Sequence, residues 1–328
     1  MNTLKMVSSD TSLVSKISRR LVLEYMLHLK NYNENNNHLI FSDPRGGSTW
    51  LMELIQQITN EPVIFEPLHL KYNKDDTFRN LNFGWRQHIP VNAEWKEAEK
   101  AFDVLFTGKL LNHGVFQYST LHQCLKSESF LFKFVFGSAL LPWLASRYTF
   151  KYKPLYMVRH PFAVVSSQLK HGAWEYPFDK YIIPDTPYND NYLEHQEFLN
   201  TLKTKEESLV VQWCLANQST LSHKKNNIEW ITLNYEEFIV NPKLSMERIL
   251  QEWGLKYDLS KIDFEKNSST TKKGSPQDII KRISHWKNNF NNQQINKMLR
   301  VLDYFDVSCY SERFEPEIIY NYGVVIKN

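Results

Sequence analysis

The stretch from His38 to Met52, HLIFSDPRGGSTWLM, constrains the fold of this chain more than any other. Its apolar beginning, 38–42, is typical of a short buried strand, and residues 43–47 then predict a tight turn before a helix. The first backbone N–H groups of a helix have no partner within the helix and lie at the positive end of its dipole. An anion placed there gains several hydrogen bonds at once. The stretch therefore predicts a phosphate-binding turn, residues 43–49, which we call the cradle.

The residues of the cradle suit an anion. Only ten glycines occur in 328 residues, below the average usage of about 7%, so the adjacent pair Gly46 and Gly47 is not filler, and glycine lets the backbone approach phosphate oxygens. Arg45 adds a fixed fork of donors, and Ser48 and Thr49 add hydroxyl groups. The alternative is an ordinary strand-to-helix turn in which Ser48 is the N-cap.

The P-loop of nucleoside triphosphatases is the obvious comparison for this turn. It requires a lysine directly before the hydroxyl residue that holds magnesium. Here Gly47 occupies that position, and no first glycine precedes it at the required spacing. The run Pro44–Trp50 instead resembles the 5′-phosphosulfate loop of the sulfotransferases, in which a basic residue, a glycine, two hydroxyl residues and a tryptophan follow a strand.

A second motif lies at Leu155–Ser167, where an apolar strand ends in Arg159 and Ser167 follows eight residues later. The serine lies about two turns into the next helix, so both side chains can face one phosphate. This pair resembles the sulfotransferase site for the 3′-phosphate of the donor nucleotide. His160 and Phe162 depart from the R-D-P-R-A of many relatives.

The resemblance implies transfer of a sulfuryl group from 3′-phosphoadenosine 5′-phosphosulfate to a hydroxyl or an amine, without a metal. Arg45 and the backbone of Gly47–Thr49 are expected to stabilise charge on the leaving bisphosphate. Trp50 is expected to stack on adenine, with packing in the core as the alternative. Lys272-Lys273-Gly274, followed by 285–287, resembles the C-terminal loop that folds over the nucleotide, although a solvated surface loop is the alternative.

An acceptor hydroxyl must lose its proton, so we expect a base within about 3 Å of it. Glu66 is the first candidate, because it resembles the glutamate after the second strand in some members of the family. His69 is the second candidate and His113 the third. Lys133 either contacts the sulfuryl group or pairs with a buried carboxylate.

The alternation of apolar strands and helices predicts an α/β fold with three layers, αβα, around a central parallel sheet. The resemblance makes this the P-loop-like sulfotransferase fold. We expect 1–37 to be a polar, partly helical lead-in and 38–328 to be one domain with acceptor-site insertions at about 70–128 and 171–205. Further strands are expected at 62–65, 130–136, 154–158 and 228–233, with helices at 48–58, 162–170, 210–221 and 243–253.

Two softer patterns are expected to support the fold. Trp213 and Asn217 resemble a W-x-x-x-N pattern and share one face of a helix, which favours a buried structural pair. Tyr235-Glu236 with Asn241-Pro242 resembles the family signature that leads into the next helix.

The composition excludes several function classes. A net charge of +3 and a pI near 8.5 are too mild for a dedicated nucleic-acid binder. Three widely spaced cysteines without a C-x-x-C pair indicate neither a disulfide framework nor a zinc site. No stretch approaches the length of a membrane helix, so we expect a cytoplasmic protein without membrane or nucleic-acid partners. A homo-oligomer stays open.

Other functions remain open at this point. A magnesium-dependent nucleotide kinase would share the cradle, and a non-catalytic nucleotide-binding protein could use the same fold. Aromatic residues and scattered carboxylates in 70–128 and 174–197 suggest a small-molecule acceptor. A bacterial or cyanobacterial secondary metabolite, such as a guanidinium alkaloid toxin, would fit, and a glycan or a lipid alcohol would fit almost as well.

Overall fold

The computed structural model describes residues 13–30, 32–69, 76–172, 181–270 and 278–313. Within them the strands form one five-stranded sheet in the order β2-β3-β1-β4-β5. Every neighbouring pair is parallel, which confirms the predicted parallel sheet. The strands are β1 His38–Ser42, β2 Val63–Phe65, β3 Leu131–Phe134, β4 Leu155–Val158 and β5 Ile231–Asn234.

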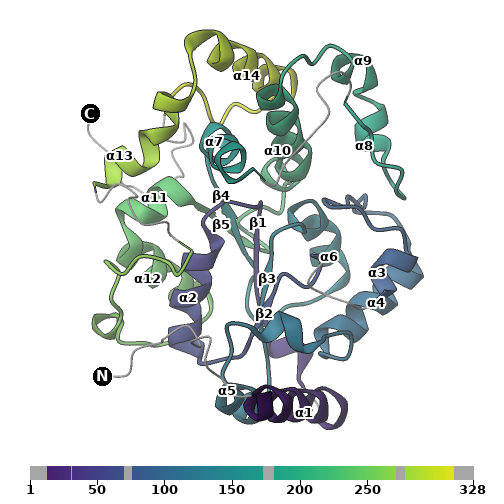
Figure 1. The fold of residues 1–328 in the computed structure, drawn as a ribbon, viewed down its shortest axis with the longest axis vertical. Coiled ribbons are helices and arrows are strands. Elements are labelled where there is room, and N and C mark those ends of the chain that lie inside the picture. The colour runs from purple at the N-terminus through teal and green to yellow at the C-terminus, as the bar shows by residue number, and fades with distance from the viewer. Residues whose placement is uncertain (1–12, 31, 70–75, 173–180, 271–277, 314–328) are drawn as a thin grey trace.

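Side chains along the strands alternate between two hydrophobic cores, one on each face of the sheet. In β1, Leu39 and Phe41 belong to one core and Ile40 to the other. Because a strand turns successive side chains to opposite faces, both faces are buried, and the layers are helix, sheet and helix (Figure 1). The smaller core is covered by α2 Ser48–Thr59, α11 Tyr235–Val240 and α12 Pro242–Glu252, and the larger by α4 Lys96–Phe106, α6 Leu141–Arg147, α7 Pro161–His171, α10 Lys205–Leu221 and α14 Asn292–Tyr304.

The helices predicted at 48–58, 162–170 and 243–253 are present within one residue of the predicted bounds, and the helix predicted at 210–221 begins five residues earlier, at Lys205. The lead-in forms α1 (Leu13–Leu29), and its Leu23 and Leu27 are buried in the larger core. The described part of 70–128 is mostly helical or irregular, and no helix among the described residues is long and apolar enough to cross a membrane. The remaining helices are α3 Thr77–Asn80, α5 Leu121–Lys126, α8 Asp190–Leu193, α9 Gln196–Leu199 and α13 Ile279–Ser284, with 3₁₀ turns at Glu34–Asn36, His113–Phe116, Ser138–Leu140, Leu259–Lys261 and His285–Asn289.

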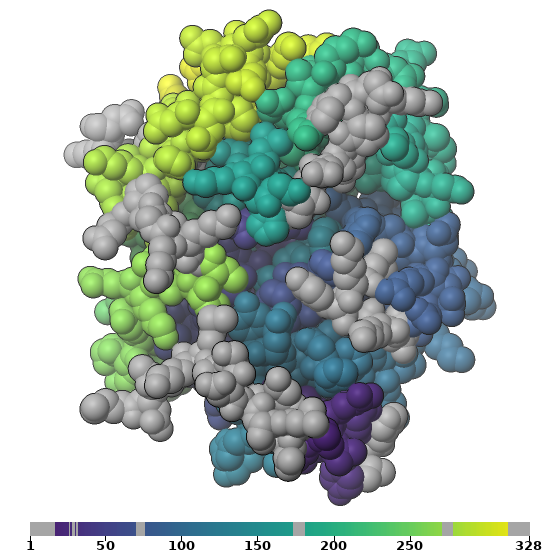
Figure 2. Space-filling view, viewed as in Figure 1, coloured from purple at the N-terminus to yellow at the C-terminus, as the bar shows by residue number. Residues whose placement is uncertain are grey.

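The strand order places the site. From central β1 the chain first builds β2 and β3 on one side and then crosses to β4 and β5 on the other. Open parallel sheets bind ligands at such a switch point, outside the carboxyl ends of the strands. The cradle follows β1 and Arg159 follows β4, so both predicted motifs lie at this point. Figure 2 shows a recess near the centre of one face, where purple atoms from early in the chain lie set back below the teal α7.

Candidate functional site

The cradle adopts the strand–turn–helix geometry expected for an anion site. Gly47, with a φ of 94°, is the N-cap of α2 and supplies no side-chain cap. Ser48 is therefore the first helical residue, and the N-cap role expected for it in an ordinary strand-to-helix turn is wrong. The turn is closed by a bond from the Gly46 N–H to the Asp43 carbonyl at 2.9 Å, and the Trp50 N–H bonds to the Gly47 carbonyl at 3.2 Å. The remaining N–H groups of the first turn have no helical acceptor.

Both glycines of the cradle are required by close packing. A Cβ on Gly46 would overlap the hydroxyl oxygen of Ser42, and a Cβ on Gly47 would overlap the ring of Tyr235. The positive φ of Gly47 adds strain for any other residue. A P-loop lysine at position 47 would have no room, which explains in physical terms why the sequence departs from the P-loop there.

The two sequence motifs meet. The Arg45 Nε donates to the Ser167 Oγ at 2.9 Å, and the Arg159 Nη1 donates to the Arg45 carbonyl at 3.1 Å. Arg45 itself has a left-handed φ of 72°, so the bond from Arg159 helps to hold a strained backbone. The structure thus brings Arg45, Arg159 and Ser167 to one place, together with Ser48 and Thr49 of α2.

The two arginines are not neutralised by the described part of the chain. Neither forms an ion pair with a described carboxylate, and the buried Nε of Arg159 has no hydrogen-bond partner there. The Arg159 guanidinium lies over the Tyr235 ring, 4.4 Å from its centroid. Burial, and then the charge of Arg159, lower the pKa of Arg45. Two neighbouring cations with spare donors favour an anion between them.

Buried polar groups hold Arg159 from behind. The Trp213 Nε1 donates to the Arg159 carbonyl at 3.1 Å. The Asn217 Oδ1 accepts from the Tyr156 hydroxyl at 2.7 Å, while its amide donates to the Trp213 carbonyl. The prediction of a buried structural pair at Trp213 and Asn217 is therefore confirmed, and Trp213 also positions a residue of the site.

His160, which directly follows Arg159, is a structural residue here. Its Nδ1 accepts from the Phe162 N–H, and its Nε2 donates to the carbonyls of Ser311 and Arg313. Burial lowers the pKa of His160 to about 3, so the ring is neutral near pH 7. The His160 N–H donates to Glu236, whose pKa burial raises to about 7.

Glu66 and Lys133 form an ion pair at the carboxyl ends of β2 and β3. The Lys133 Nζ lies 2.8 Å from the Glu66 Oε1, and the two side chains are 3% and 13% exposed, respectively. Burial lowers the pKa of Lys133, while Glu66 opposes that shift. The ammonium also lies 4.2 Å from the centroid of the Phe65 ring. Of the two roles expected for Lys133, pairing with a buried carboxylate is therefore the one observed.

An aromatic group lies beside Glu66. The rings of His69, Trp85 and Phe136 contact one another pairwise at centroid distances of 4.8 to 5.5 Å. The His69 N–H bonds to the Glu66 carbonyl at 2.9 Å. Trp85 is 40% exposed, so these rings form a partly open wall that contains His69, three residues after the expected base.

The described structure does not bring three of the predicted residues or segments to the site at the carboxyl ends of the strands. Trp50 is 8% exposed and packs in the core, edge-on to Phe238, which was the alternative for that residue. His113 is exposed, and its 3₁₀ turn leads to Ser119, which bonds to Val63 at the amino end of β2. Residues Lys272, Lys273 and Gly274 lie outside the described part; just before them, Ser269 bonds to Glu53 of α2.

Sequence reasoning missed Arg86. Its Nε donates to the Asp43 Oδ1 at 2.9 Å, and both side chains are buried. The signal available in the sequence was a carboxylate inside an anion-binding turn, which calls for a cation nearby. Nothing in the spacing of the residues identified which cation it would be.

Solved structures that resemble this chain include three sulfotransferases. The sulfotransferase domain of the Synechococcus PCC 7002 olefin synthase is 16% identical, covers 85% of this chain and 96% of its own length, and has a TM-score of 0.43. The sulfotransferase domain from the curacin biosynthetic pathway is 13% identical, with coverages of 83% and 97% and a TM-score of 0.42. Mouse sulfotransferase SULT7A1 complexed with PAP is 14% identical, with coverages of 87% and 90% and a TM-score of 0.37.

No protein-family model and no curated protein matches the chain. The identities of 13–16% and TM-scores of 0.37–0.43 are too low to transfer an activity. We therefore derive the function from the side chains of the site.

Proposed function

We propose that this protein is a sulfotransferase that moves a sulfuryl group from 3′-phosphoadenosine 5′-phosphosulfate to a hydroxyl or an amine of a small molecule. The observation that carries the proposal is the contact of Arg45 with both Ser167 and Arg159. Two motifs that separately resemble sites for the two ends of one donor nucleotide come together at the start of a helix. A donor with phosphates at both its 3′ and 5′ positions would use both.

The spare donors of the site match such a nucleotide. Arg45 and the free N–H groups of the cradle would bind the 5′-phosphosulfate, and Arg159 and Ser167 the 3′-phosphate. The buried Nε of Arg159 has no partner among the described residues, and a buried donor without an acceptor costs stability. A phosphate oxygen would remove that cost, which supports Arg159 as a phosphate ligand.

The proposed transfer runs directly from donor to acceptor, without a covalent bond to the protein. In an in-line reaction the bond from sulfur to the bridging oxygen breaks, the bond from sulfur to the acceptor oxygen forms, and the acceptor proton passes to a base. Negative charge grows on the bridging oxygen, where Arg45 and the cradle N–H groups are best placed to stabilise it.

Glu66 is the base we propose. One of its oxygens is held by Lys133, and the other makes no bond within the described residues. The left-handed backbone of Glu66, with a φ of 52°, is strained, and such strain concentrates at functional sites. His69 is the second choice, since its ring is engaged edge-on by Trp85 and Phe136.

The acceptor is proposed as a small molecule handled in the cytoplasm. The wall of His69, Trp85 and Phe136 beside Glu66 would exclude water from an acceptor hydroxyl or amine. A secondary metabolite such as a guanidinium alkaloid toxin is one form that this proposal can take, and a glycan or a lipid alcohol is the other.

Thermal stabilisation by 3′-phosphoadenosine 5′-phosphate in EDTA, compared with ATP plus magnesium, tests the proposal. A ligand at about a hundred times its Kd adds about 2.7 kcal/mol, which raises Tm by several degrees in a domain of this size. Stabilisation by the bisphosphate without metal supports the proposal. Stabilisation only by ATP with magnesium would favour the nucleotide kinase, and binding of the phosphosulfate donor without transfer to any acceptor would favour a non-catalytic binding protein.

A further inference from the structure

Asp43 is a buried carboxylate at the start of the cradle. Asp43 is 4% exposed and Arg86 is 8% exposed. The guanidinium of Arg86 contacts both carboxylate oxygens of Asp43. The Arg86 Nε donates to Oδ1 at 2.9 Å, and its Nη2 lies 3.5 Å from Oδ2. A third bond, from the Arg86 Nη1 to the Gln212 Oε1 at 3.1 Å, ties the pair to α10. The pair thus connects the cradle, the segment after α3 and a helix of the larger core.

A bare carboxylate at this position would oppose the binding of any anion in the cradle. At a separation of about 7 Å and an effective dielectric constant of about 20, one like charge lowers the affinity of a singly charged anion about 50-fold. Arg86 supplies the opposite charge at nearly the same place. The Arg86 guanidinium also holds Asp43 in place at the start of the turn, where the Asp43 carbonyl accepts from the Gly46 N–H.

Other bonds to the turn do not replace this charge. The Gln168 amide donates to the Pro44 carbonyl at 3.2 Å and is neutral. Arg159 donates to the Arg45 carbonyl, but its charge faces Tyr235. Burial raises the pKa of Asp43, and the charge and hydrogen bonds of Arg86, together with a hydrogen bond from Gln168, oppose that shift. Arg86 is the charged group among these partners.

We propose that Arg86 is a positioning residue of the donor site, and that its pairing with Asp43 sets the affinity of the cradle for an anionic nucleotide. The inference rests on the proposed function, because it needs an anion in the cradle. It adds a residue from the segment after α3 that neither motif contains.

A cycle of charge variants tests the proposal. Asp43→Asn, Arg86→Gln, the double variant and the wild type are titrated calorimetrically with 3′-phosphoadenosine 5′-phosphate in EDTA, and the Tm of each protein is recorded. We expect Arg86→Gln to bind about 50-fold more weakly, and the double variant to return to within about twofold of the wild type. Asp43→Asn should bind at least as tightly as the wild type, because it removes a negative charge.

If the pair of Asp43 and Arg86 only supported the fold, the nucleotide affinities of the variants would follow a different order. Every substitution would then weaken binding, and the double variant would bind no better than Arg86→Gln. If Arg86→Gln does not fold, Asp43→Asn decides, since weaker binding by that variant overturns the proposal. The matched control is Arg147→Gln on α6, which removes a bond of the same kind and length, 2.9 Å to Glu99, and should leave the affinity unchanged.

Failure of this inference differs from failure of the proposed function. A wild type that binds the bisphosphate, with no recovery in the double variant, overturns the role of Arg86 alone. A wild type that does not bind the bisphosphate at millimolar concentration overturns both.

Discussion

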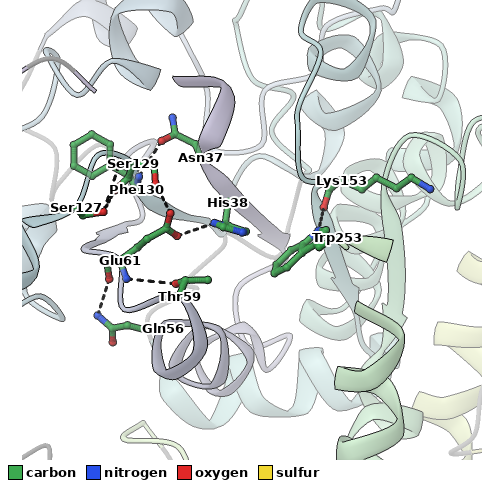
Figure 3. Close-up of polar contacts among 10 residues, drawn as sticks. All are labelled: Asn37, His38, Gln56, Thr59, Glu61, Ser127, Ser129, Phe130, Lys153 and Trp253. Carbon is green, nitrogen blue, oxygen red and sulfur yellow. Dashed lines mark hydrogen bonds and ion pairs between the residues drawn. The ribbon is translucent and has the colours of Figure 1, made fainter. Parts of the chain in front are cut away.

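Two glutamates flank β2, and they differ in what their carboxylates contact. Glu61 precedes the strand and lies at the amino end of the sheet, whereas Glu66 follows it at the carboxyl end. Both oxygens of Glu61 are bonded within the chain, one to the Ser129 hydroxyl and one to the His38 Nδ1 at 2.7 Å (Figure 3). Glu66 uses one oxygen for Lys133 and keeps the other without a partner in the described structure.

The groups around the two carboxylates also differ in whether their polar atoms have partners within the chain. Beside Glu61, the His38 ring stacks on Tyr152 at 4.1 Å and lies 4.6 Å from Trp253, whose Nε1 donates to the Lys153 carbonyl. Apart from the Nε2 of His38, the polar atoms of these side chains that are buried have partners in the described part of the chain.

Beyond Glu66 lie Arg45 and Arg159, which form no ion pair with a described carboxylate, and the N–H groups that open α2. A polar group whose partners all come from the chain supports the fold. An excess of donors and positive charge at a strand end points to an anionic ligand, so the comparison separates a structural end of the sheet from a functional one.

The largest expected difference between the two ends is in turnover. Glu66→Gln should lower kcat about 10²- to 10⁴-fold, because a general base contributes that much, and should leave the affinity for the donor product unchanged. The matched substitution Glu61→Gln should lower Tm and leave kcat of the folded protein within a factor of about two. Steady-state assays with donor and acceptor check both, and a Glu66→Gln enzyme with near wild-type kcat would transfer the role of base to His69.

Arg159→Ala should lower the affinity for 3′-phosphoadenosine 5′-phosphate about 100-fold or more, because a charge-assisted pair in a part-buried site is worth about 2–5 kcal/mol. Calorimetric titration measures this. Arg300→Ala, which breaks an ion pair with Glu207 at 2.9 Å between α14 and α10, is the control and should bind the nucleotide normally. Equal losses in the two variants would mean that Arg159 only supports the fold.

Gly47→Ala and Gly172→Ala compare two left-handed glycines that cap helices, with φ values of 94° and 76°. Both substitutions should cost about 1–2 kcal/mol for the left-handed backbone. Among the residues that the structure describes, the new Cβ would meet another group only at Gly47, where it would overlap the Tyr235 ring, so we expect a further cost of about 1–3 kcal/mol there from overpacking. Urea denaturation measures the difference, and equal costs at both positions would contradict the packing of Tyr235 under the cradle.

The smallest expected effect is at Ser167. Removing its hydroxyl in Ser167→Ala should lower nucleotide affinity about fivefold, the value of one net hydrogen bond. Ser166→Ala is the control, since that hydroxyl accepts from Asn289 instead. A larger loss at Ser166 than at Ser167 would contradict the assignment of the second motif.

The sequence predicted the sheet and both motifs because these depend on local spacing. The strands could be recognised from apolar runs, and the eight-residue spacing from Arg159 to Ser167 fixes their relative positions through helix geometry alone. The contact between the motifs followed from the topology of parallel sheets, in which the carboxyl ends of neighbouring strands lie at one edge.

The ion-pair partners of charged residues could not be predicted from local spacing in the sequence. The pairing of Asp43 with Arg86 joins a turn to a segment without regular periodicity, so neither strand nor helix spacing identifies it. The packing of Trp50 against Phe238 was legible in the sequence. Trp50 lies one helical turn before Leu54 and therefore shares the buried face of α2.

The most direct measurement is a calorimetric titration of the wild type, in EDTA, with 3′-phosphoadenosine 5′-phosphate and with adenosine 5′-phosphate. If Arg159 and Ser167 bind a 3′-phosphate, the bisphosphate will bind about 100-fold more tightly, and Arg159→Ala will remove most of that preference. Equal affinities for the two nucleotides, or binding that requires magnesium, would contradict the assignment of the carboxyl end of the sheet as a sulfotransferase donor site.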